Sequence, residues 1–224
     1  AGTMGRTVAE LAEKKENITF LGMVEPLRGE TLTDLGIADV IVDFSHPDNL
    51  PEICNYARDK GCAVVIATTG HEREELAMID RLSESVPVVM SANFSIGISV
   101  VKNIVAQISP LLKDDFDIEI IEKHHRRKLD APSGTALALA AAIDRDKACE
   151  WVYGRKGQSR RGNEIGIHGI RGGTIVGEHT VLFAGEDEII EIRHSAASRR
   201  IFAVGALKAA SMPPGFYSVE DALK

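Results

Sequence analysis

The stretch "CAVVIATTG", Cys62–Gly70, decides the fold class, because an apolar run in it is followed at once by small polar residues. A short run rich in β-branched residues is typical of a strand that is buried on both faces of a parallel sheet. Similar runs flank it at Ala38–Ser45 and Val86–Ser95. The segments between the runs, Pro47–Lys60 and Glu72–Ser83, have the spacing of helices. This alternation predicts a parallel α/β sheet.

The first residues of the chain resemble the back half of a dinucleotide-binding turn. Glycines in "AGTMG", residues 1–5, would let the backbone approach a pyrophosphate, and the helix predicted at Thr3–Lys15 would offer free amides. We predict a strand at Asn17–Glu25, ending in an acid that can accept hydrogen bonds from ribose hydroxyls and repel a 2′-phosphate. The alternatives are a plain helix start and a surface glutamate.

Polar or turn residues follow each of the four predicted strands of this sheet. Parallel sheets bind ligands at the carboxyl ends of their strands, so we expect a crevice there. The residues at these ends are Glu25, then Asp43, Phe44 and Ser45, then Thr68, Thr69 and Gly70, and finally Ala92, Asn93 and Phe94.

The pattern changes after about Ile96. An amphipathic helix is predicted at Ile98–Leu112, and strand alternation with glycine turns then marks four segments. These segments are 116–125, 163–173, 174–185 and 187–196, the last three read as a meander in a mixed or antiparallel sheet. A helix is predicted at 201–210. We predict a dinucleotide-binding domain of residues 1–94, to which 204–224 returns, and a second α+β domain of 95–203 with an open mixed sheet.

The stretch "EKHHRRKLDAPSGTALALAAAI", Glu122–Ile143, concentrates positive character in an acidic chain. Residues 123–128 are all cationic or can become so, whereas the whole chain has formal net charge −7. A basic six-residue run can bind nucleic acid. The acidic balance and the strand-turn-helix setting favour a local anion site instead. We therefore expect no nucleic-acid partner.

Two kinds of chemistry meet in this stretch. His124 and His125 would point to opposite faces of a strand, which makes them a poor metal pair. Residues 132–135 form a plausible helix N-cap whose amides, together with the cations, can bind a carboxylate. Histidine and lysine also offer proton donors near neutral pH. We expect Asp130 to orient a cation or to cap the turn.

Composition bounds the remaining possibilities. Hydrophobic residues make up 44% and charged residues 26% of the 224 residues, which are ordinary globular values. No apolar run approaches a membrane span and nothing resembles a signal peptide. The three cysteines form no CxxC pair, so neither a zinc site nor a disulfide framework is indicated. We expect a cytoplasmic protein without a metal and without a membrane partner.

The run "EKHHRRKLDAPSGTA" is similar to the signature of the 4-hydroxy-tetrahydrodipicolinate reductase (dihydrodipicolinate reductase) family. "VDFSHP", "VIATTG", "SANFSIG" and "GEHTVLF" resemble further blocks of that family in the right order. The resemblance implies a Rossmann domain and a substrate domain whose open sheet builds a homotetramer. It also implies NAD(P)H-dependent reduction of a small dicarboxylate, 4-hydroxy-tetrahydrodipicolinate, in diaminopimelate and lysine biosynthesis.

The resemblance implies roles for individual residues. His124 falls at the family's proton donor and Lys128 at its partner. The positions that bind substrate carboxylates are His125, Ser133, Gly134 and Thr135. The cofactor positions are Gly2, Met4 and Gly5 for the pyrophosphate, Glu25 for the adenosine ribose, and Phe44, Ala67, Thr68, Thr69, Ser91, Ala92, Asn93 and Phe94, of which 68–69 and 91–94 line the nicotinamide site.

Departures from the family pattern bear on the cofactor. The family commonly has cations where Thr3 and Pro26 stand, and their loss beside Glu25 tilts the preference toward NADH, although both nicotinamides are often accepted. Two spans, 25–38 and 143–151, are shorter than the family leads us to expect. The first strand of the family and the start of its glycine turn are missing as well. We therefore expect residues of the natural protein to be absent from this sequence.

Alternatives to this function remain open at this stage. Another nicotinamide dehydrogenase acting on a small dicarboxylate would share the first domain, and a non-catalytic NAD-sensing protein would keep the glycine turn. Neither needs a proton donor beside a carboxylate cradle. Arg171, Arg199 and Arg200 could approach the phosphates or a neighbouring subunit, but solvated side chains are expected for all three.

Overall fold

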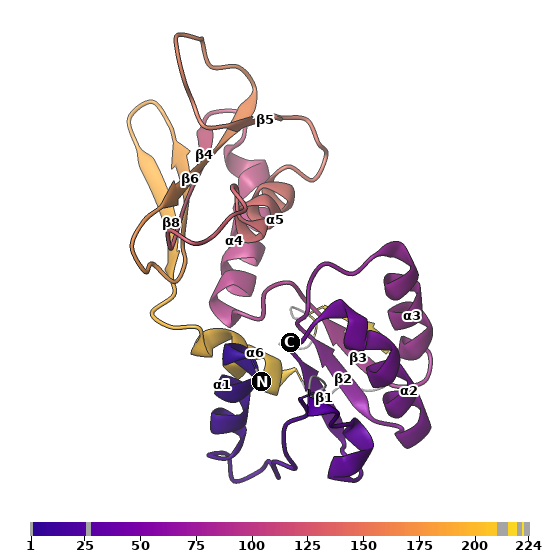
Figure 1. Cartoon of the computed structure of the whole chain (residues 1–224). Helices are drawn as coiled ribbons and strands as arrows, with labels where there is room; N and C mark the ends of the chain where they lie inside the picture. The colour runs from indigo at the N-terminus through magenta and orange to yellow at the C-terminus, as the bar shows by residue number, and fades with distance from the viewer. Residues whose placement is uncertain (1, 26–27, 210–214, 219–220, 222–224) are drawn as a thin grey trace. The chain divides into compact units, whose positions relative to one another are not determined.

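The structure, a computed structural model, describes residues 2–25, 28–209, 215–218 and 221. The chain forms two compact units, the first built from residues 1–96 and 199–224 and the second from residues 97–198 (Figure 1). The second unit is thus inserted into the first. The chain re-enters the first unit at Arg199, before residue 204 where the sequence analysis placed that boundary.

The first unit contains a four-stranded parallel sheet in the order β1-β2-β3-β9. Its strands are β1 (Val40–Asp43), β2 (Ala63–Ile66), β3 (Pro87–Met90) and β9 (Gly215–Tyr217). Its helices are α1 (Thr3–Ala12), α2 (Leu50–Lys60), α3 (Arg73–Ser83) and α6 (Arg200–Lys208), with 3₁₀ turns at Leu32–Leu35 and Pro47–Asn49. The parallel α/β sheet predicted from the β-branched runs is confirmed.

Both faces of this sheet are buried, which is why its strands are apolar throughout. Val64 and Val88 pack with residues of α2 and α3 on one face. Val65 and Val89 pack with Phe94 and α6 on the other face (Figure 1). The contact with α6 is close, because a Cβ added at Gly205 would lie 1.8 Å from the carbonyl oxygen of Phe94. Gly205 therefore lets α6 approach the chain that follows β3.

The predicted strand at Asn17–Glu25 is wrong. Those residues are described, and they contain neither a strand nor a helix. β1 forms the edge of the described sheet and pairs with β2 alone, so the segment has no ladder partner. Alternation predicts which face of a strand is buried, but hydrogen bonds to a neighbour make the strand. Without one, Leu21 and Met23 remain 45% and 36% exposed.

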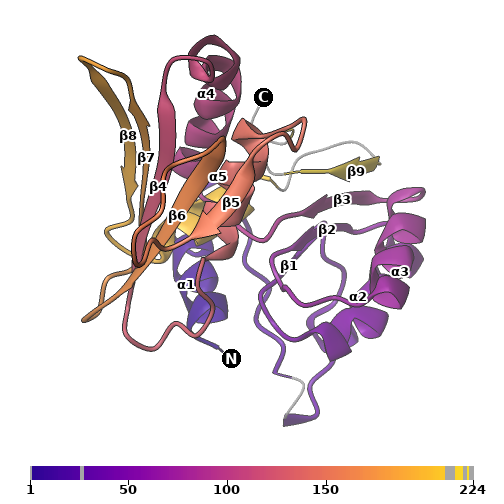
Figure 2. The ribbon, with the colours of Figure 1, turned by 90° about the horizontal axis from the view of Figure 1, so that it is seen from above.

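The second unit contains a five-stranded mixed sheet in the order β5-β6-β4-β7-β8 (Figure 2). Its strands are β4 (Asp117–His124), β5 (Glu150–Tyr153), β6 (Glu164–Arg171), β7 (Glu178–Ala184) and β8 (Ile189–Ser195), and its helices are α4 (Ile96–Leu112) and α5 (Gly134–Ile143). The mixed sheet is confirmed, but the meander is wrong. β4 lies between β6 and β7, parallel to the first and antiparallel to the second.

One face of this sheet carries apolar rows that pack against α4 and α5. Ile118 of β4 is paired with Ile165 and Phe183. The next residue of β4 on this face is Ile120. Because side chains alternate along a strand, Glu122 lies on this same face. The covered face therefore changes from apolar to polar at Glu122.

The polar row continues across the sheet. Glu122 is paired with Gly169 of β6 and with His179 of β7, and His179 is paired in turn with His194 of β8. The following pair on the same face joins His124 to Arg171. The end of the covered face thus gathers acidic, basic and imidazole side chains from four neighbouring strands.

Two further properties concern the described residues as a set. None of the helices among residues 2–25, 28–209, 215–218 and 221 is both long and apolar enough to cross a membrane. In the same residues, no three His, Cys, Asp or Glu side chains are grouped so that they could hold a metal ion.

Candidate active site

The first part of the candidate site is built where β4 ends and α5 begins. His124 is the last residue of β4 and is buried, and its carbonyl oxygen accepts a hydrogen bond from the amide of Gly172 at 2.9 Å. Ser133 caps α5, since its Oγ accepts from the amide of Ala136 at 3.2 Å. The N-cap expected in this stretch is therefore confirmed, and it holds the helix start beside the strand end.

Glu122 is the centre of this region and is fully buried. Arg171 donates two hydrogen bonds to it, from Nη1 to Oε2 at 2.8 Å and from Nη2 to Oε1 at 2.6 Å. The amide of Ser133 donates to Oε1 at 3.1 Å. Burial alone would raise the pKa of the Glu122 carboxyl, but hydrogen bonds from Arg171 and His124 outweigh it and hold that pKa below its usual value. Glu122 is therefore a carboxylate at neutral pH.

The ionised Glu122 determines the protonation of His124. His124 Nδ1 lies 2.5 Å from Glu122 Oε2, and an ionised carboxylate can only accept a hydrogen bond. Nδ1 must therefore carry a hydrogen, which leaves Nε2 as the atom that can exchange a proton with a bound molecule. Burial lowers the pKa of His124, and although Glu122 opposes this effect, the net shift is downward. The protonated imidazole is thus a stronger acid than free histidine.

The space in front of His124 Nε2 depends on Gly177. A Cβ built at Gly177 would lie 3.1 Å from Nε2 and 3.4 Å from Cδ2 of the His124 ring. The distance to Nε2 is tighter than an ordinary van der Waals contact, so a side chain at this position would require the imidazole to shift by a few tenths of an ångström. Gly177 precedes β7 and belongs to the "GEHTVLF" segment, which the sequence analysis did not connect with His124.

Lys128 and Asp130 form an ion pair in the turn between β4 and α5. Lys128 Nζ lies 2.8 Å from Asp130 Oδ1, and the hydrogen bond from Lys128 lowers the pKa of the Asp130 carboxyl. The expectation that Asp130 orients a cation is confirmed. The Lys128 side chain is 23% exposed, so it retains contact with solvent.

His179 approaches both Ser133 and His124. Its Nε2 lies 3.1 Å from Ser133 Oγ, and its ring meets the His124 ring edge-on with centroids 5.2 Å apart. Burial lowers the pKa of His179 to about 4, and the nearby His124 contributes to the shift. His179 is therefore neutral at physiological pH.

The prediction of a solvated side chain for Arg171 is wrong. It is 18% exposed and pairs with Glu122, and its Nη2 also donates to the carbonyl oxygen of Asp130 at 2.6 Å. The partners Arg171 and Glu122 are 49 residues apart. Only the register of β4 with β6 brings them together. Glu122, Arg171 and His179 were thus missed as site residues, although Glu122 is the acid of the recognised signature and His179 lies in the "GEHTVLF" block.

The remaining predicted substrate residues lie around the start of α5. His125 follows β4 and is partly exposed, and Gly134 and Thr135 are the first two residues of the helix. The amide of Ser133, which the sequence analysis had offered to a substrate carboxylate, donates instead to Glu122. Ser133 can therefore offer a bound anion its hydroxyl but not its amide.

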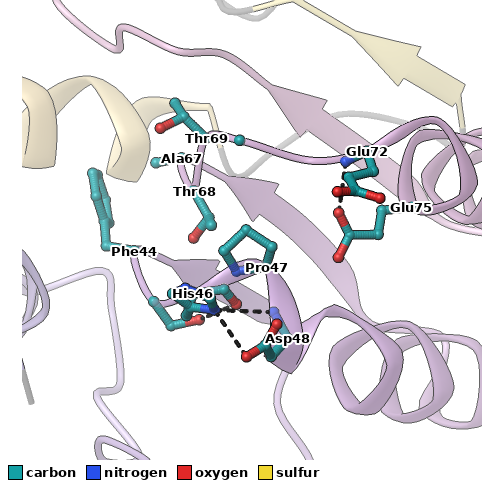
Figure 3. A pocket seen from close by; sticks show the side chains of 11 residues that line it. Phe44, His46, Pro47, Asp48, Ala67, Thr68, Thr69, Glu72 and Glu75 are labelled. Carbon is teal, nitrogen blue, oxygen red and sulfur yellow. Dashed lines mark hydrogen bonds and ion pairs between the residues drawn. The ribbon is translucent and has the colours of Figure 1, made fainter. Parts of the chain in front are cut away.

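The first unit has a cavity of about 670 Å³ at the carboxyl ends of β1 and β2 (Figure 3). Phe44, Ala67, Thr68 and Thr69, all predicted to bind the cofactor, line it together with Ser45, His46, Pro47, Asp48, Gly70, Glu72 and Glu75. The volume is typical of a small-molecule site. The Thr68 hydroxyl is buried and has no hydrogen-bond partner among the described residues, so it offers a polar contact to a ligand.

The other predicted cofactor residues do not line this cavity. Ser91, Ala92, Asn93 and Phe94 form the turn after β3, where Ser91 Oγ donates to the carbonyl oxygen of Asn93 at 2.9 Å. The ring of Phe94 packs against that of Phe44, with centroids 6.5 Å apart. The turn is therefore connected to the cavity wall through an aromatic contact.

The glycine turn and the acid lie at the start of the first unit. Gly2 is the N-cap of α1 and Met4 and Gly5 belong to its first turn, where amides are unpaired by the helix itself. The carboxylate of Glu25 lies 3.0 Å from Nε of Arg28. The pyrophosphate and ribose roles of these residues stay predictions, and Pro26 lies outside the described residues.

Comparison with known proteins shows what this architecture is similar to. A model of the N-terminus of dihydrodipicolinate reductase matches residues 1–94, and a model of its C-terminus matches residues 97–223. The chain is 50% identical to the 4-hydroxy-tetrahydrodipicolinate reductase of Clostridium tetani, covering 98% of the chain and 92% of the relative. Identity to that of Clostridium novyi is 45%, covering 100% and 95%.

A solved structure is also similar to the whole chain. The dipicolinate-bound dihydrodipicolinate reductase of Paenisporosarcina sp. TG-14 superimposes with a TM-score of 0.78, covering 98% of this chain and 95% of that one. The sequence identity is 22%, so this likeness concerns the fold alone. It confirms the predicted combination of a Rossmann-type parallel sheet with a second domain built on a mixed sheet.

Proposed function

The chain belongs to the dihydrodipicolinate reductase family, and from this premise we propose that His124 is the proton donor of its reaction. The enzyme is an NAD(P)H-dependent oxidoreductase that reduces 4-hydroxy-tetrahydrodipicolinate in diaminopimelate and lysine biosynthesis. The observation that carries the proposal is the contact of His124 Nδ1 with the buried carboxylate of Glu122. It leaves Nε2 as the only ring atom that can give a proton.

The reaction adds a hydride and a proton to the substrate after its hydroxyl has left as water. When bound, the nicotinamide would supply the hydride. His124 Nε2 gives the proton to the carbon next to the one that receives the hydride, and solvent then restores the proton on Nε2. Glu122 holds Nδ1–H throughout, so the imidazole alternates between cation and neutral ring without rotating. General acid catalysis of this kind contributes about 10²- to 10⁴-fold to the rate.

We propose that the two carboxylates of the substrate are held by groups around the start of α5. Lys128 and His125 supply positive charge or hydrogen bonds, and Gly134 and Thr135 supply amides at a helix N-terminus, where anions are favoured. Ser133 contributes its hydroxyl. Support for a dicarboxylate comes from the dipicolinate bound to the related enzyme of Paenisporosarcina, because dipicolinate also carries two carboxylates on one ring.

For the cofactor, we propose that the pyrophosphate binds at Gly2, Met4 and Gly5, and the adenosine ribose at Glu25. The nicotinamide would bind at the cavity of Figure 3 and the turn at 91–94. The unpartnered Thr68 hydroxyl supports this use of the cavity. Glu25 favours NADH, because its charge repels a 2′-phosphate. Arg28 beside it offsets part of that charge, so we expect NADPH to be accepted as well.

We also propose that the enzyme is a cytoplasmic homotetramer. In support of assembly, the face of the second unit's sheet opposite α4 and α5 presents exposed apolar side chains, including Ile170 at 46% and Ile189 at 64%. Exposed apolar surface of this kind often marks a protein interface. Sedimentation equilibrium tests the assembly, and a monomer at micromolar concentration would contradict it.

The function is tested by following NADH oxidation with freshly prepared 4-hydroxy-tetrahydrodipicolinate, with NADPH run in parallel. We expect turnover with both cofactors and a higher kcat/KM with NADH. Dipicolinate should inhibit competitively with the substrate. If neither NADH nor NADPH were oxidised, the proposed site would be contradicted. A strong preference for NADPH would contradict only the role of Glu25.

Gly177 offers a test of the space in front of His124. In Gly177→Ala the new methyl group should shift the imidazole by a few tenths of an ångström, and kcat should fall by about 10-fold, because small misplacements of a reacting group are costly. The matched control is Gly172→Ala, where an added Cβ meets nothing within 4 Å. Equal kcat in the two variants would show that the Gly177 side of the ring is not used.

A further inference from the structure

Ser133 Oγ and His179 Nε2 share a single contact, 3.1 Å long, and the hydrogens at this contact do not balance. A serine hydroxyl has one hydrogen and can accept two hydrogen bonds, one of which comes here from the amide of Ala136. Neutral His179 has one ring hydrogen, on Nδ1 or on Nε2. The two side chains therefore bring two hydrogens to one contact, which can use only one of them.

Each tautomer of His179 leaves a different hydrogen without an acceptor. If Nδ1 carries the hydrogen, Nε2 accepts from the Ser133 hydroxyl. Nδ1–H is then a buried donor that has no partner among the described residues. If Nε2 carries the hydrogen, it donates to Ser133 Oγ, and the serine hydrogen points elsewhere. In that case Nδ1 is a bare acceptor, and orphaned buried acceptors are more common than orphaned N–H groups.

A bound acceptor beside Ser133 satisfies both hydrogens. With His179 in the Nε2–H form, Ser133 Oγ accepts from Ala136 and from His179, so both of its acceptor positions are used. Its own hydrogen can then be donated only to another acceptor, such as a carboxylate oxygen. The nearby Glu122 does not take the hydroxyl hydrogen, because its contact with Ser133 is a hydrogen bond from the amide.

We infer that His179 is a positioning residue that donates from Nε2 to Ser133 Oγ and thereby directs the serine hydrogen to a carboxylate of the substrate. The inference rests on the proposed function, which makes the start of α5 the carboxylate site. His179 acts through Ser133 and touches neither the hydride nor the proton that is transferred. Its loss should therefore weaken substrate binding more than it slows the chemical step.

The test compares two isosteres of the imidazole. Glutamine can place its amide nitrogen near the position of Nε2, whereas asparagine reaches only the position of Nδ1. We expect His179→Gln to bind dipicolinate within about threefold of the wild-type Kd, and His179→Asn to bind it about 10-fold more weakly, because a hydrogen bond to a charged group is lost. KM for the substrate should rise in parallel while kcat changes little.

A double-mutant cycle separates action through Ser133 from an independent effect. Ser133→Ala should also weaken dipicolinate about 10-fold, and Ser133→Ala with His179→Asn should be no weaker than Ser133→Ala alone. Additive losses, or wild-type affinity in His179→Asn, would overturn the inference. Circular dichroism and the Kd of NADH are the folding controls, since a structural defect would change both.

A direct measurement in the wild-type enzyme does not depend on any variant. Nitrogen-15 chemical shifts of His179 in the dipicolinate complex should show the Nε2–H tautomer, and the Nδ1–H tautomer would overturn the inference. Turnover without any effect of Ser133→Ala on dipicolinate binding would overturn the inference but leave the proposed function standing. A wild-type enzyme that neither binds dipicolinate nor oxidises NAD(P)H would overturn both.

Discussion

Replacing His124 by glutamine should lower kcat by about 10²- to 10⁴-fold, the range that general acid catalysis contributes. Glutamine can place its amide nitrogen near the position of Nε2, but the amide has no proton that it can give near neutral pH. The affinity for NADH should stay within about twofold, because general acid catalysis acts on the transition state rather than on cofactor binding. Stopped-flow single turnovers with enzyme in excess would measure the chemical step separately from product release.

The matched control is His125→Gln, the neighbouring imidazole that we assign to substrate binding. It should raise KM with a smaller loss of kcat, because it removes an interaction made before the transition state as well as in it. In the wild-type enzyme, kcat should fall as pH rises through the pKa of the proton donor, and this limb should disappear in His124→Gln. Wild-type turnover in His124→Gln would mean that another group gives the proton.

Replacing Arg171 by methionine should lower the free energy of unfolding by about 3–5 kcal/mol, the usual cost of leaving one partner of a buried ion pair uncompensated. Glu122 would remain fully buried without the two hydrogen bonds from Arg171. The pKa of Glu122 should then rise, because burial already opposes its ionisation. Urea unfolding at pH 7.5 and at one fixed protein concentration would measure the loss.

A second substitution separates stability from catalysis. Glu122→Gln with Arg171→Met removes the uncompensated charge, so much of the lost stability should return. The activity should not return, because an amide no longer restricts His124 to the Nδ1–H tautomer. Arg193→Met is the control, since Arg193 pairs with Glu178 at 2.7 Å but is 56% exposed, and such pairs contribute about 1 kcal/mol or less. Recovery of both properties would mean that Glu122 serves the fold alone.

Much of the fold could be predicted because the signals are local. β-branched runs identified β1, β2 and β3, and the Ser133 cap followed from residue types at fixed spacing. The wrong strand at Asn17–Glu25 shows the limit of that approach, since pairing with a neighbour is not a local property. β9 has only three residues and was missed for the same reason.

The candidate site was predictable to a smaller extent. The "EKHHRRKLDAPSGTA" run placed His124, Lys128 and the start of α5 in one region, and the structure brings these residues together. Arg171 and His179 reach Glu122 only through the registers of β6 and β7 with β4. The meander expected from chain order would have put β6 next to β7 and separated these partners. Strand order, which no single segment encodes, therefore determined the part of the site that was missed.

The discontinuity of the first unit has a consequence for how the protein is made. Residues 97–198 leave the ribosome as one continuous segment. The mixed sheet can therefore fold while the residues that follow are still being synthesised. The face of the parallel sheet that α6 covers cannot be covered before then, because α6 and β9 follow the second unit in the chain. During that interval Val65, Val89 and Phe94 have no helix over them. Nascent chains that stall before Arg199 should therefore be clients for chaperones that bind apolar strands.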